Sequence, residues 1–381
     1  MDHLLTAEER QHHSSLVKLV GDTWGDEAAS WERDQSLPEH VVRWCAEQGL
    51  MGAALPRSAG GGGWSAVETG LMYEALGRVS ASLGSLVNVH GMMAQTVLKW
   101  GTEQQRRELG PALASGDRVA AICMTEPHAG SDLAAITTSV AECDGRLVLD
   151  GAKVFITFGG RADVFLVFGK RAGRSVACLV ERDNPGVTIR PMGEALGLRA
   201  AALARVEFRD CVIEPEALVG RDDFALSVLV PLALEHGRHA VAWMATGMLR
   251  ASFDTCASFA AERRAFDRTL VEHGQVQSLL ARMATDLEAA GHLCAAASRA
   301  LDAGDPAATE RVLMAKYFAC RAAEEHTAQA VQLLGSAGVL ESTGVARHYR
   351  DSKILNILEG TTQILERQLA PRLAHAARRS G

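Results

Sequence analysis

The chain has 381 residues and a formal net charge of −7, from 39 Lys and Arg against 46 Asp and Glu. This length exceeds the usual size of a single hydrophobic core, so two or three packed units are expected. The charge is mild and no basic patch is interleaved with aromatic residues, which excludes nucleic acid as an expected partner.

The cysteines are widely spaced, and no Cys-x-x-Cys pair occurs among them. They are Cys45, Cys123, Cys143, Cys178, Cys211, Cys256, Cys294 and Cys320. This spacing argues against a disulfide framework and a thiolate metal site, so we expect buried thiols in a reducing compartment. The first residues lack the basic and apolar regions of a secretory signal, and no run of about eighteen apolar residues occurs. We therefore expect a cytoplasmic protein with no membrane partner.

The first third of the chain shows helical spacing of its apolar residues. Between Thr6 and Asp117 they recur every three to four positions, and Val41, Val42 and Cys45 share one side of such a helix. This pattern predicts an N-terminal all-α domain over residues 1–117.

The apolar period shortens to two in the middle of the chain. Val206 and Phe208 alternate with charged neighbours, and Asp-Gly pairs at Asp144 and Asp150 predict two hairpin turns. The pattern predicts a β domain, as a barrel or sandwich, over residues 118–223.

The helical period returns from residue 224 onward. It is clearest over residues 276–297, where Val276, Leu280, Met283 and Leu287 begin one apolar face. This predicts a C-terminal helical bundle over residues 224–381 and places the whole chain in the α+β class.

Three other types of site are not supported by the sequence. Residues 61–66 formally match a dinucleotide fingerprint, but no strand precedes them and no acid follows at the required distance. His236 and His239 lack a third ligand, and the Glu-x-x-His pattern of a di-metal bundle occurs once, at Glu9. No G-x-S-x-G motif is present. We expect no bound metal.

One carboxylate, Glu359, lies inside the apolar run ILNILEGTTQIL. A carboxylate loses favourable hydration in apolar surroundings. Glu359 therefore either ends a helix at Gly360 and faces water, or is retained there for its chemistry. The segment alone leaves both possibilities open.

Five segments, in order, resemble the acyl-CoA dehydrogenase family over nearly the whole chain. They are CMTEPHAGSD (123–132), KVFIT (153–157), ERRAF (262–266), AVQLLGSAG (330–338) and YRDSKILNILEGTTQI (349–364). The resemblance implies that family's fold, with an N-terminal helical domain, a middle β domain and a C-terminal four-helix bundle. It also implies FAD as the cofactor.

The resemblance assigns roles to individual residues. Those implied to lie at the flavin ring are Met124, Thr125, Phe155, Ile156 and Thr157. Ser131 is implied to lie near the flavin phosphate or the acyl-thioester arm, and Thr361 and Gln363 are implied to touch FAD. Those implied to hold the rest of the cofactor are Arg263, Phe266, Gln332 and Gly335, with the segment around Gln332 serving a neighbouring subunit. The substrate is implied to contact Ser131, Arg238 and Gly360.

In this family a base removes the α-proton of an acyl thioester while a hydride leaves the β-carbon for the flavin. The resemblance implies that Glu359 is that base, with its pKa raised in a dry pocket. A backbone N–H of the Glu-Gly turn can bind the thioester carbonyl. Some branches carry the base on an earlier helix, where this chain has Gly237 and where Glu235 would be a poor substitute.

Several positions depart from the family pattern. Phe158 stands where Asn is common, Asp267 replaces a usual Gly, and Gly274 replaces an expected Gln. An acid at residue 267 is an unfavourable neighbour for a pyrophosphate. These departures concern the adenine end of the FAD site and leave the flavin end intact.

Residues 91–101 and 236–252 look more like family members from polyketide and other secondary-metabolite pathways than like β-oxidation enzymes. The implied function is FAD-dependent removal of an α-proton and a β-hydride from an acyl thioester, on acyl-carrier protein or CoA, to give an enoyl thioester. An electron-acceptor flavoprotein and a homo-tetramer or homo-dimer are implied as well. Two alternatives remain open, an oxidase of the same fold that uses O₂ and a non-catalytic scaffold.

Overall fold

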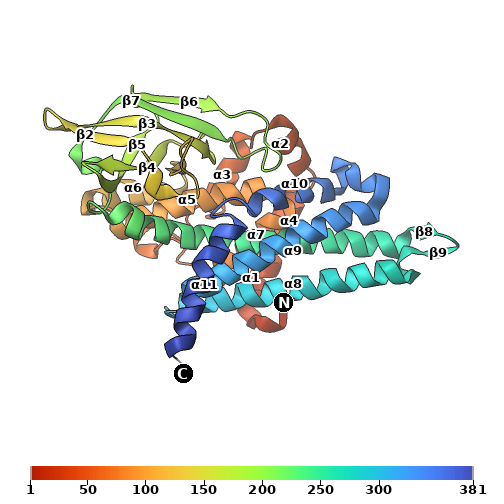
Figure 1. Ribbon diagram of the computed structural model, residues 1–381. Coiled ribbons are helices and arrows are strands. Elements are labelled where there is room, and N and C mark those ends of the chain that lie inside the picture. Colours follow the sequence, from red (N-terminus) through yellow and green to blue (C-terminus); the bar gives the residue numbers. More distant parts are fainter. Residues whose placement is uncertain (1, 380–381) are drawn as a thin grey trace.

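The computed structural model describes residues 2–379, which form a β domain packed against a long helical body (Figure 1). The helices before the sheet are α1 (Ala7–Trp24), α2 (Ala28–Asp34), α3 (Glu39–Glu47), α4 (Ala66–Val79), α5 (Ala81–Trp100) and α6 (Glu103–Ser115). Helix, then sheet, then helix is the predicted order, and the α+β class is confirmed.

The middle region forms one sheet with the strand order β1-β4-β2-β3-β7-β6, and β5 pairs with β4. Its strands are β1 (Ala120–Cys123), β2 (Ser139–Cys143), β3 (Arg146–Ile156), β4 (Val164–Arg171), β5 (Arg174–Glu181), β6 (Val187–Pro191) and β7 (Ala204–Ile213). Asp144 and Gly145 form the predicted turn between β2 and β3, both with positive φ.

The second predicted turn is wrong, because Asp150 and Gly151 lie inside β3. The register of β3 against β7 shifts between Leu149 and Gly151, so the pair marks a bulge. A Cβ on Gly151 would lie 2.5 Å from Thr138 Oγ1, which explains a glycine within this strand. The expectation for the cysteines also needs one correction. Cys143 is exposed beside the β2–β3 turn, whereas the other cysteines are buried.

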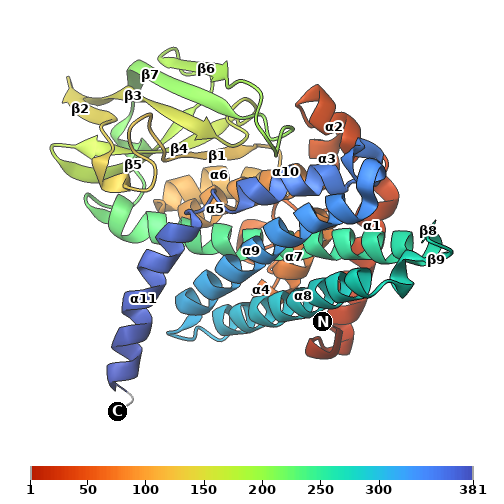
Figure 2. The ribbon, with the colours of Figure 1, turned by 45° about the vertical axis from the view of Figure 1, so that its right-hand side comes forward.

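The C-terminal helices pack along one another, and the last one projects away from them (Figure 2). They are α7 (Val230–Glu262), α8 (Gly274–Asp302), α9 (Ala308–Leu334), α10 (Val345–Leu355) and α11 (Thr362–Arg379), with the short hairpin β8 (Arg264–Ala265) and β9 (Arg268–Thr269) between α7 and α8. Among the described helices, none is both long and apolar enough to cross a membrane.

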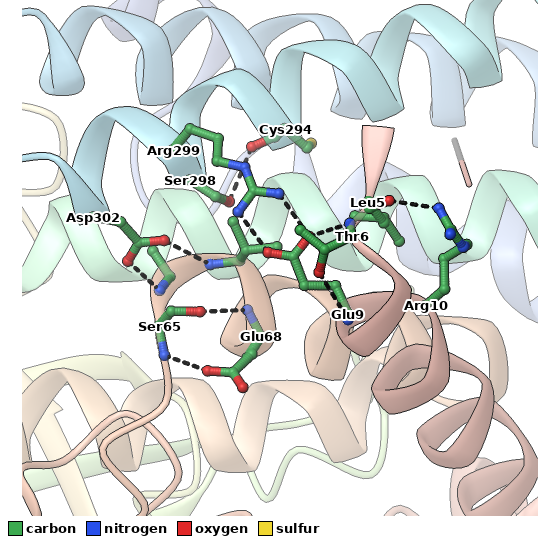
Figure 3. A network of polar contacts seen from close by, with 12 residues as sticks. Leu5, Thr6, Glu9, Arg10, Ser65, Glu68, Cys294, Ser298, Arg299 and Asp302 are labelled. Atoms are coloured by element: carbon green, nitrogen blue, oxygen red, sulfur yellow. Dashed lines mark hydrogen bonds and ion pairs between the residues drawn. The ribbon is translucent and has the colours of Figure 1, made fainter. Parts of the chain in front are cut away.

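The N-terminal helices dock onto α8 through polar contacts at their own starts (Figure 3). Thr6 and Ser65 each open a helix with a capping box. The Glu9 carboxylate of the first capping box accepts hydrogen bonds from both terminal nitrogens of Arg299. The Asp302 carboxylate accepts the first backbone N–H groups of α4, from Ala66 and Val67. The capping groups therefore also connect the two helical regions.

Helices α4 and α7 approach each other closely because glycines lie at their crossing. A Cβ on Gly247 would lie 2.0 Å from the Glu74 carbonyl oxygen, and one on Gly70 would lie 2.2 Å from Trp243 Nε1. The close approach positions α7, whose first turns carry the residues of the candidate site.

Replacing Gly247 by Ala is expected to destabilise the fold by about 1–3 kcal/mol or more, because the clash is with backbone that cannot rotate away. The matched control is Gly21→Ala in α1, where a Cβ meets nothing within 4 Å. That change is expected to stabilise by about 0.5–1 kcal/mol through helix propensity. Urea unfolding of the two variants measures the contrast, and equal stabilities would contradict it.

Candidate active site

Glu359 lies in a tight turn between α10 and α11. Its φ is +55° and that of Gly360 is +97°, so two consecutive residues adopt left-handed conformations. The turn directs the carboxylate onto α7, where a Cβ on Gly237 would lie 2.7 Å from Glu359 Oε2. Of the two possibilities left open by the sequence, the structure therefore favours a carboxylate turned toward protein over one turned toward water.

Two buried cations hold the backbone of this turn. Arg238 Nε donates to the Glu359 carbonyl at 3.0 Å, and Lys316 Nζ donates to the Gly360 carbonyl at 2.7 Å. Arg238 is 6% exposed and Lys316 is fully buried. Charge-assisted hydrogen bonds are stronger than neutral ones, so α7 and α9 together fix a strained turn that the local sequence would not maintain. We call Arg238 and Lys316 the carbonyl clamp.

Burial raises the pKa of Glu359 to about 7. The positive charges of Arg238 and Lys316 and a hydrogen bond from Asn88 act in the opposite direction and limit the rise. Part of the Glu359 residue is exposed, but its carboxylate lies against Gly237 and so loses most of its hydration. Near pH 7 both the acid and the carboxylate are therefore populated.

Arg238 was expected to bind substrate, but its hydrogen bond in the structure goes to the Glu359 backbone. Lys316 was not predicted at all. Glu235, the weak alternative base, accepts a hydrogen bond from Thr309 Oγ1 at 2.6 Å. Among the described residues, no hydrogen bond joins Glu235 to Glu359. A lysine in an alanine-rich helix carries no sequence signal that distinguishes it from a solvated surface charge.

A buried ion pair fixes the loop after β1 to β3. Lys153 Nζ donates to Glu126 Oε1 at 2.8 Å and to the Met124 carbonyl at 3.0 Å. Burial alone would raise the pKa of Glu126, but hydrogen bonds from Lys153, Thr138 and Thr137 outweigh it and lower the pKa to about 2. Both ion-pair residues lie within segments of the family resemblance, yet neither was selected from the sequence.

The end of β3 presents an aromatic ring beside this loop. Phe155 is 61% exposed with a φ of +58°, and its N–H donates to Met192 Sδ at 3.1 Å. Thr157 is half-buried, whereas the Ile156 side chain packs in the core of the sheet. Ile156 therefore packs into the core while Phe155 and Thr157 keep accessible surface, and contact of this segment with the flavin stays a prediction.

The other residues predicted for the flavin end lie on loops and helix starts. Met124 is buried, Thr125 is half-buried, and Ser131 is exposed. Thr361 Oγ1 accepts the Ile364 N–H at the start of α11, and Gln363, the second residue of that helix, is exposed.

The residues predicted for the other end of FAD lie at the far end of the helical bundle. Arg263 follows α7 directly, and Phe266 is 89% exposed at the tip of the β8–β9 hairpin. Gln332 and Gly335 lie at the end of α9, which shares an apolar cluster with the end of α7. Most of the length of α7, whose 33 residues span roughly 50 Å, separates Arg238 from Arg263. Within one chain, the residues predicted for the other end of FAD therefore lie far from Arg238 and the Glu359 turn.

Among the departures from the family pattern, the structure explains Asp267 by its backbone conformation. It occupies the hairpin tip after Phe266 with a φ of +64°, a conformation that Asp adopts more readily than most residues. Gly274 opens α8, and a Cβ there would meet nothing within 4 Å. The buried Phe158 has a φ of +55° and donates its N–H to the Ala201 carbonyl.

Comparison with known proteins places the chain in a family. Models of the N-terminal, middle and C-terminal domains of acyl-CoA dehydrogenases match residues 6–117, 121–211 and 229–374. The chain therefore belongs to the acyl-CoA dehydrogenase family, whose members are FAD-dependent oxidoreductases, and the predicted fold of that family is confirmed.

Individual relatives cover nearly the whole chain. The mitochondrial isobutyryl-CoA dehydrogenase of Dictyostelium discoideum is 30% identical over 95% of this chain and 88% of its own length. An acyl-CoA dehydrogenase of Bacillus subtilis (strain 168) is 33% identical over 93% and 96%. The solved structure of FkbI, a protein for biosynthesis of a methoxymalonyl extender unit, superposes with a TM-score of 0.88 at 32% identity, covering 94% of this chain and 99% of that chain.

The surfaces at both predicted ends fit FAD. Phe155 and Thr157 offer a ring and a hydroxyl beside the loop at Thr125, as a planar flavin requires. Arg263 offers an exposed guanidinium suited to phosphate oxygens.

Potential metal ligands gather elsewhere. Within residues 2–379, the one group of three such side chains is His3, Glu288 and His292, which connects the N-terminal segment to α8 and does not include Glu359. The expected absence of a metal at the candidate site stays a prediction.

Replacing Lys316 by Met is expected to raise the pKa of Glu359 above its wild-type value of about 7. The change removes a buried positive charge that favours the carboxylate form. ¹³C NMR titration of the Glu359 carboxyl, assigned with Glu359→Gln, measures the shift. The matched control is Lys353→Met in α10, whose ammonium pairs with Glu324. An unchanged or lowered Glu359 pKa in Lys316→Met would contradict the clamp's electrostatic role.

Proposed function

We propose that this chain dehydrogenates an acyl thioester at its α and β carbons and that Glu359 removes the α-proton. The observation that carries the proposal is a carboxylate with a pKa near 7, held against a glycine of α7 by a strained and clamped turn. A general base works best when its pKa lies near the operating pH, because it is then both available and basic enough.

Glu359, the carbonyl clamp and the backbone of the turn would each have a separate role in this reaction. Glu359 in its carboxylate form takes the α-proton, and the carbonyl clamp keeps the turn from relaxing as the carboxylate gains its proton. Among the described residues, the backbone N–H of Glu359 makes no hydrogen bond, so it is available for the thioester carbonyl, where negative charge develops. FAD, when bound, supplies the hydride acceptor. A partner flavoprotein as the electron acceptor is part of this proposal, supported by the likeness to a solved structure described as an electron-transferring flavoprotein, 27% identical over 97% of this chain.

The lysine–glutamate pair beneath the loop has a positioning role in this proposal. Lys153 and Glu126 connect the loop at Met124 to the strand that carries Phe155 and Thr157. Loss of one partner of a buried pair typically costs about 3–5 kcal/mol. The pair therefore keeps the two flavin-facing segments at a fixed separation.

Glu359→Gln is expected to keep FAD and the fold while slowing flavin reduction by on the order of 10²–10⁴, because an amide cannot accept the proton. In the wild type, reduction should fall as the pH drops through about 7, since only the carboxylate form is active. Anaerobic stopped-flow bleaching of the flavin by a competent acyl thioester measures both effects.

The matched control is Glu366→Gln on the exposed face of α11, which is expected to leave the reduction rate within a few-fold of wild type. A Glu359→Gln variant that bleaches as fast as this control would refute the assignment of the base.

We propose that a second copy of the chain completes the FAD site, in a homo-dimer or a homo-tetramer. The supporting observation is that Arg263 and Gln332 lie at the far end of α7 from Arg238, beyond the reach of one cofactor molecule. Arg263→Ala is expected to weaken both FAD retention and self-association. Sedimentation velocity with flavin absorbance tests this, and a monomer that retains stoichiometric FAD would contradict it.

We propose further that the thioester is carried by an acyl-carrier protein. The support is the likeness of residues 91–101 and 236–252 to family members from polyketide pathways, together with the 32% identity over 94% of this chain to FkbI, a protein for biosynthesis of a polyketide extender unit. Recognition of an acidic carrier should weaken as salt screens the charges between the two proteins. Matched acyl thioesters on carrier protein and on CoA, compared from low to high salt, test the proposal. Turnover of acyl-CoA equal to that of every carrier tested would exclude it.

A further inference from the structure

Three potential metal ligands meet where the 3₁₀ turn Asp2–Leu4 lies beside α8. His3 belongs to that turn, and Glu288 and His292 lie one helical turn apart on α8. The Nε2 atoms of His3 and His292 are 3.3 Å apart, and His3 Nε2 lies 3.5 Å from Glu288 Oε1. Ligand atoms of all three residues lie within 4.8 Å of one another. We call these three residues the α8 triad.

A backbone contact orients the His292 ring for metal binding. Its Nδ1 lies 2.8 Å from the Glu288 carbonyl oxygen. A carbonyl oxygen only accepts hydrogen bonds, so in the neutral ring Nδ1 carries the hydrogen and Nε2 presents its lone pair toward His3. Metal-bound histidines are commonly held in this way, with the second ring nitrogen donating to a carbonyl or a carboxylate.

The distances within the α8 triad match those of a tetrahedral zinc site. Two nitrogens bound to zinc at about 2.0–2.1 Å lie roughly 3.3–3.4 Å apart in tetrahedral geometry. The two Nε2 atoms already have this separation. The Glu288 side chain is 39% exposed, so rotation about its bonds can bring an oxygen to a similar distance from both rings. Two histidines and one glutamate form a known zinc ligand set, with water in the fourth position.

The turn that carries His3 is anchored next to α8. Leu5, two residues on, is buried in the hydrophobic core, and Arg10 Nη1 donates to the Leu5 carbonyl at 2.6 Å. Arg299 and Asp302, farther along the same side of α8, hold the starts of two N-terminal helices (Figure 3). The α8 triad therefore extends a row of polar contacts between α8 and the N-terminal helices, and little chain must be ordered to close it around an ion.

We propose that the α8 triad binds one Zn²⁺ ion and thereby fastens the turn Asp2–Leu4 to α8. Imidazole ligands favour zinc and its transition-metal neighbours over Mg²⁺ and Ca²⁺, which take oxygen ligands. The role of the ion is structural, because the α8 triad does not include Glu359. Sequence spacing carries no sign of this site, since His3 and His292 are 289 positions apart and only folding brings them together.

The test uses the untagged, FAD-loaded full chain, stripped with a chelator and titrated with ZnCl₂ near neutral pH. Isothermal titration is expected to show one strong zinc site per chain. His3→Ala and His292→Ala should each weaken zinc binding by about tenfold or more, because each removes one of three protein ligands. The matched control is His40→Ala, whose Nε2 lies 3.9 Å from Glu27 Oε2 outside any group of three ligands among residues 2–379. This control is expected to bind zinc as the wild type does.

Hydrogen exchange locates the bound ion. Zinc is expected to slow amide exchange over residues 4–10 in the wild type and in His40→Ala, but not in His3→Ala or His292→Ala, because a ligand that binds only the folded segment stabilises it. His3 lies outside the regular α-helices, so its variant tests the site even if His292→Ala disturbs α8. Absence of a strong zinc site in the wild type would overturn the inference. Equal zinc affinity in the wild type and both triad variants would overturn it as well, by showing adventitious surface binding only.

Discussion

The carbonyl clamp is the interaction on which the rest of the site depends. A Glu-Gly turn with two positive φ values is not a conformation that an isolated peptide would retain. Here the two successive carbonyls are each held by a buried cation, one from α7 and one from α9. The turn directs a carboxylate to Gly237 of α7, where the absence of a side chain leaves space for it.

The same two cations also set the electrostatic balance of the site. Burial of Glu359 favours its neutral form, and Arg238 and Lys316 favour its charged form. Burial in turn lowers the pKa values of Lys316 and Arg238, because each loses hydration. The outcome is a carboxyl group near pKa 7 that two opposing effects keep within reach of physiological pH.

The two ends of helix α7 carry residues that lie in separate regions of the structure. Its first turns carry the clamp arginine and Gly237, against which the Glu359 carboxylate lies, and its last turn leads to the exposed Arg263 and Phe266. Glycines at the crossing with α4 fix the distance between α4 and α7. The length of this helix therefore places Arg263 far from Arg238 within one chain.

The order of the motifs and the hydrophobic periods were sufficient to predict the α+β class and the family fold, and they directed attention to Glu359, whose role stays a prediction. Local patterns were less reliable where the surroundings decide the outcome. Two identical Asp-Gly pairs became a turn at Asp144 and a bulge at Asp150, because only the second lies where β3 must remain paired with β7. Strand alternation could have shown that Ile156 faces inward, but the family motif outweighed it.

What the tertiary structure alone decided is the electrostatic character of individual side chains. Lys316, Lys153 and Glu126 look like ordinary charged residues in the sequence, and packing makes them buried. The pKa of Glu359 follows from contacts with α5, α7 and α9 that are distant in the chain. Sequence determined which chemical groups are present, and their periodicity determined the fold. Their protonation and mutual distances depend on burial, which exists only once those distant helices pack together.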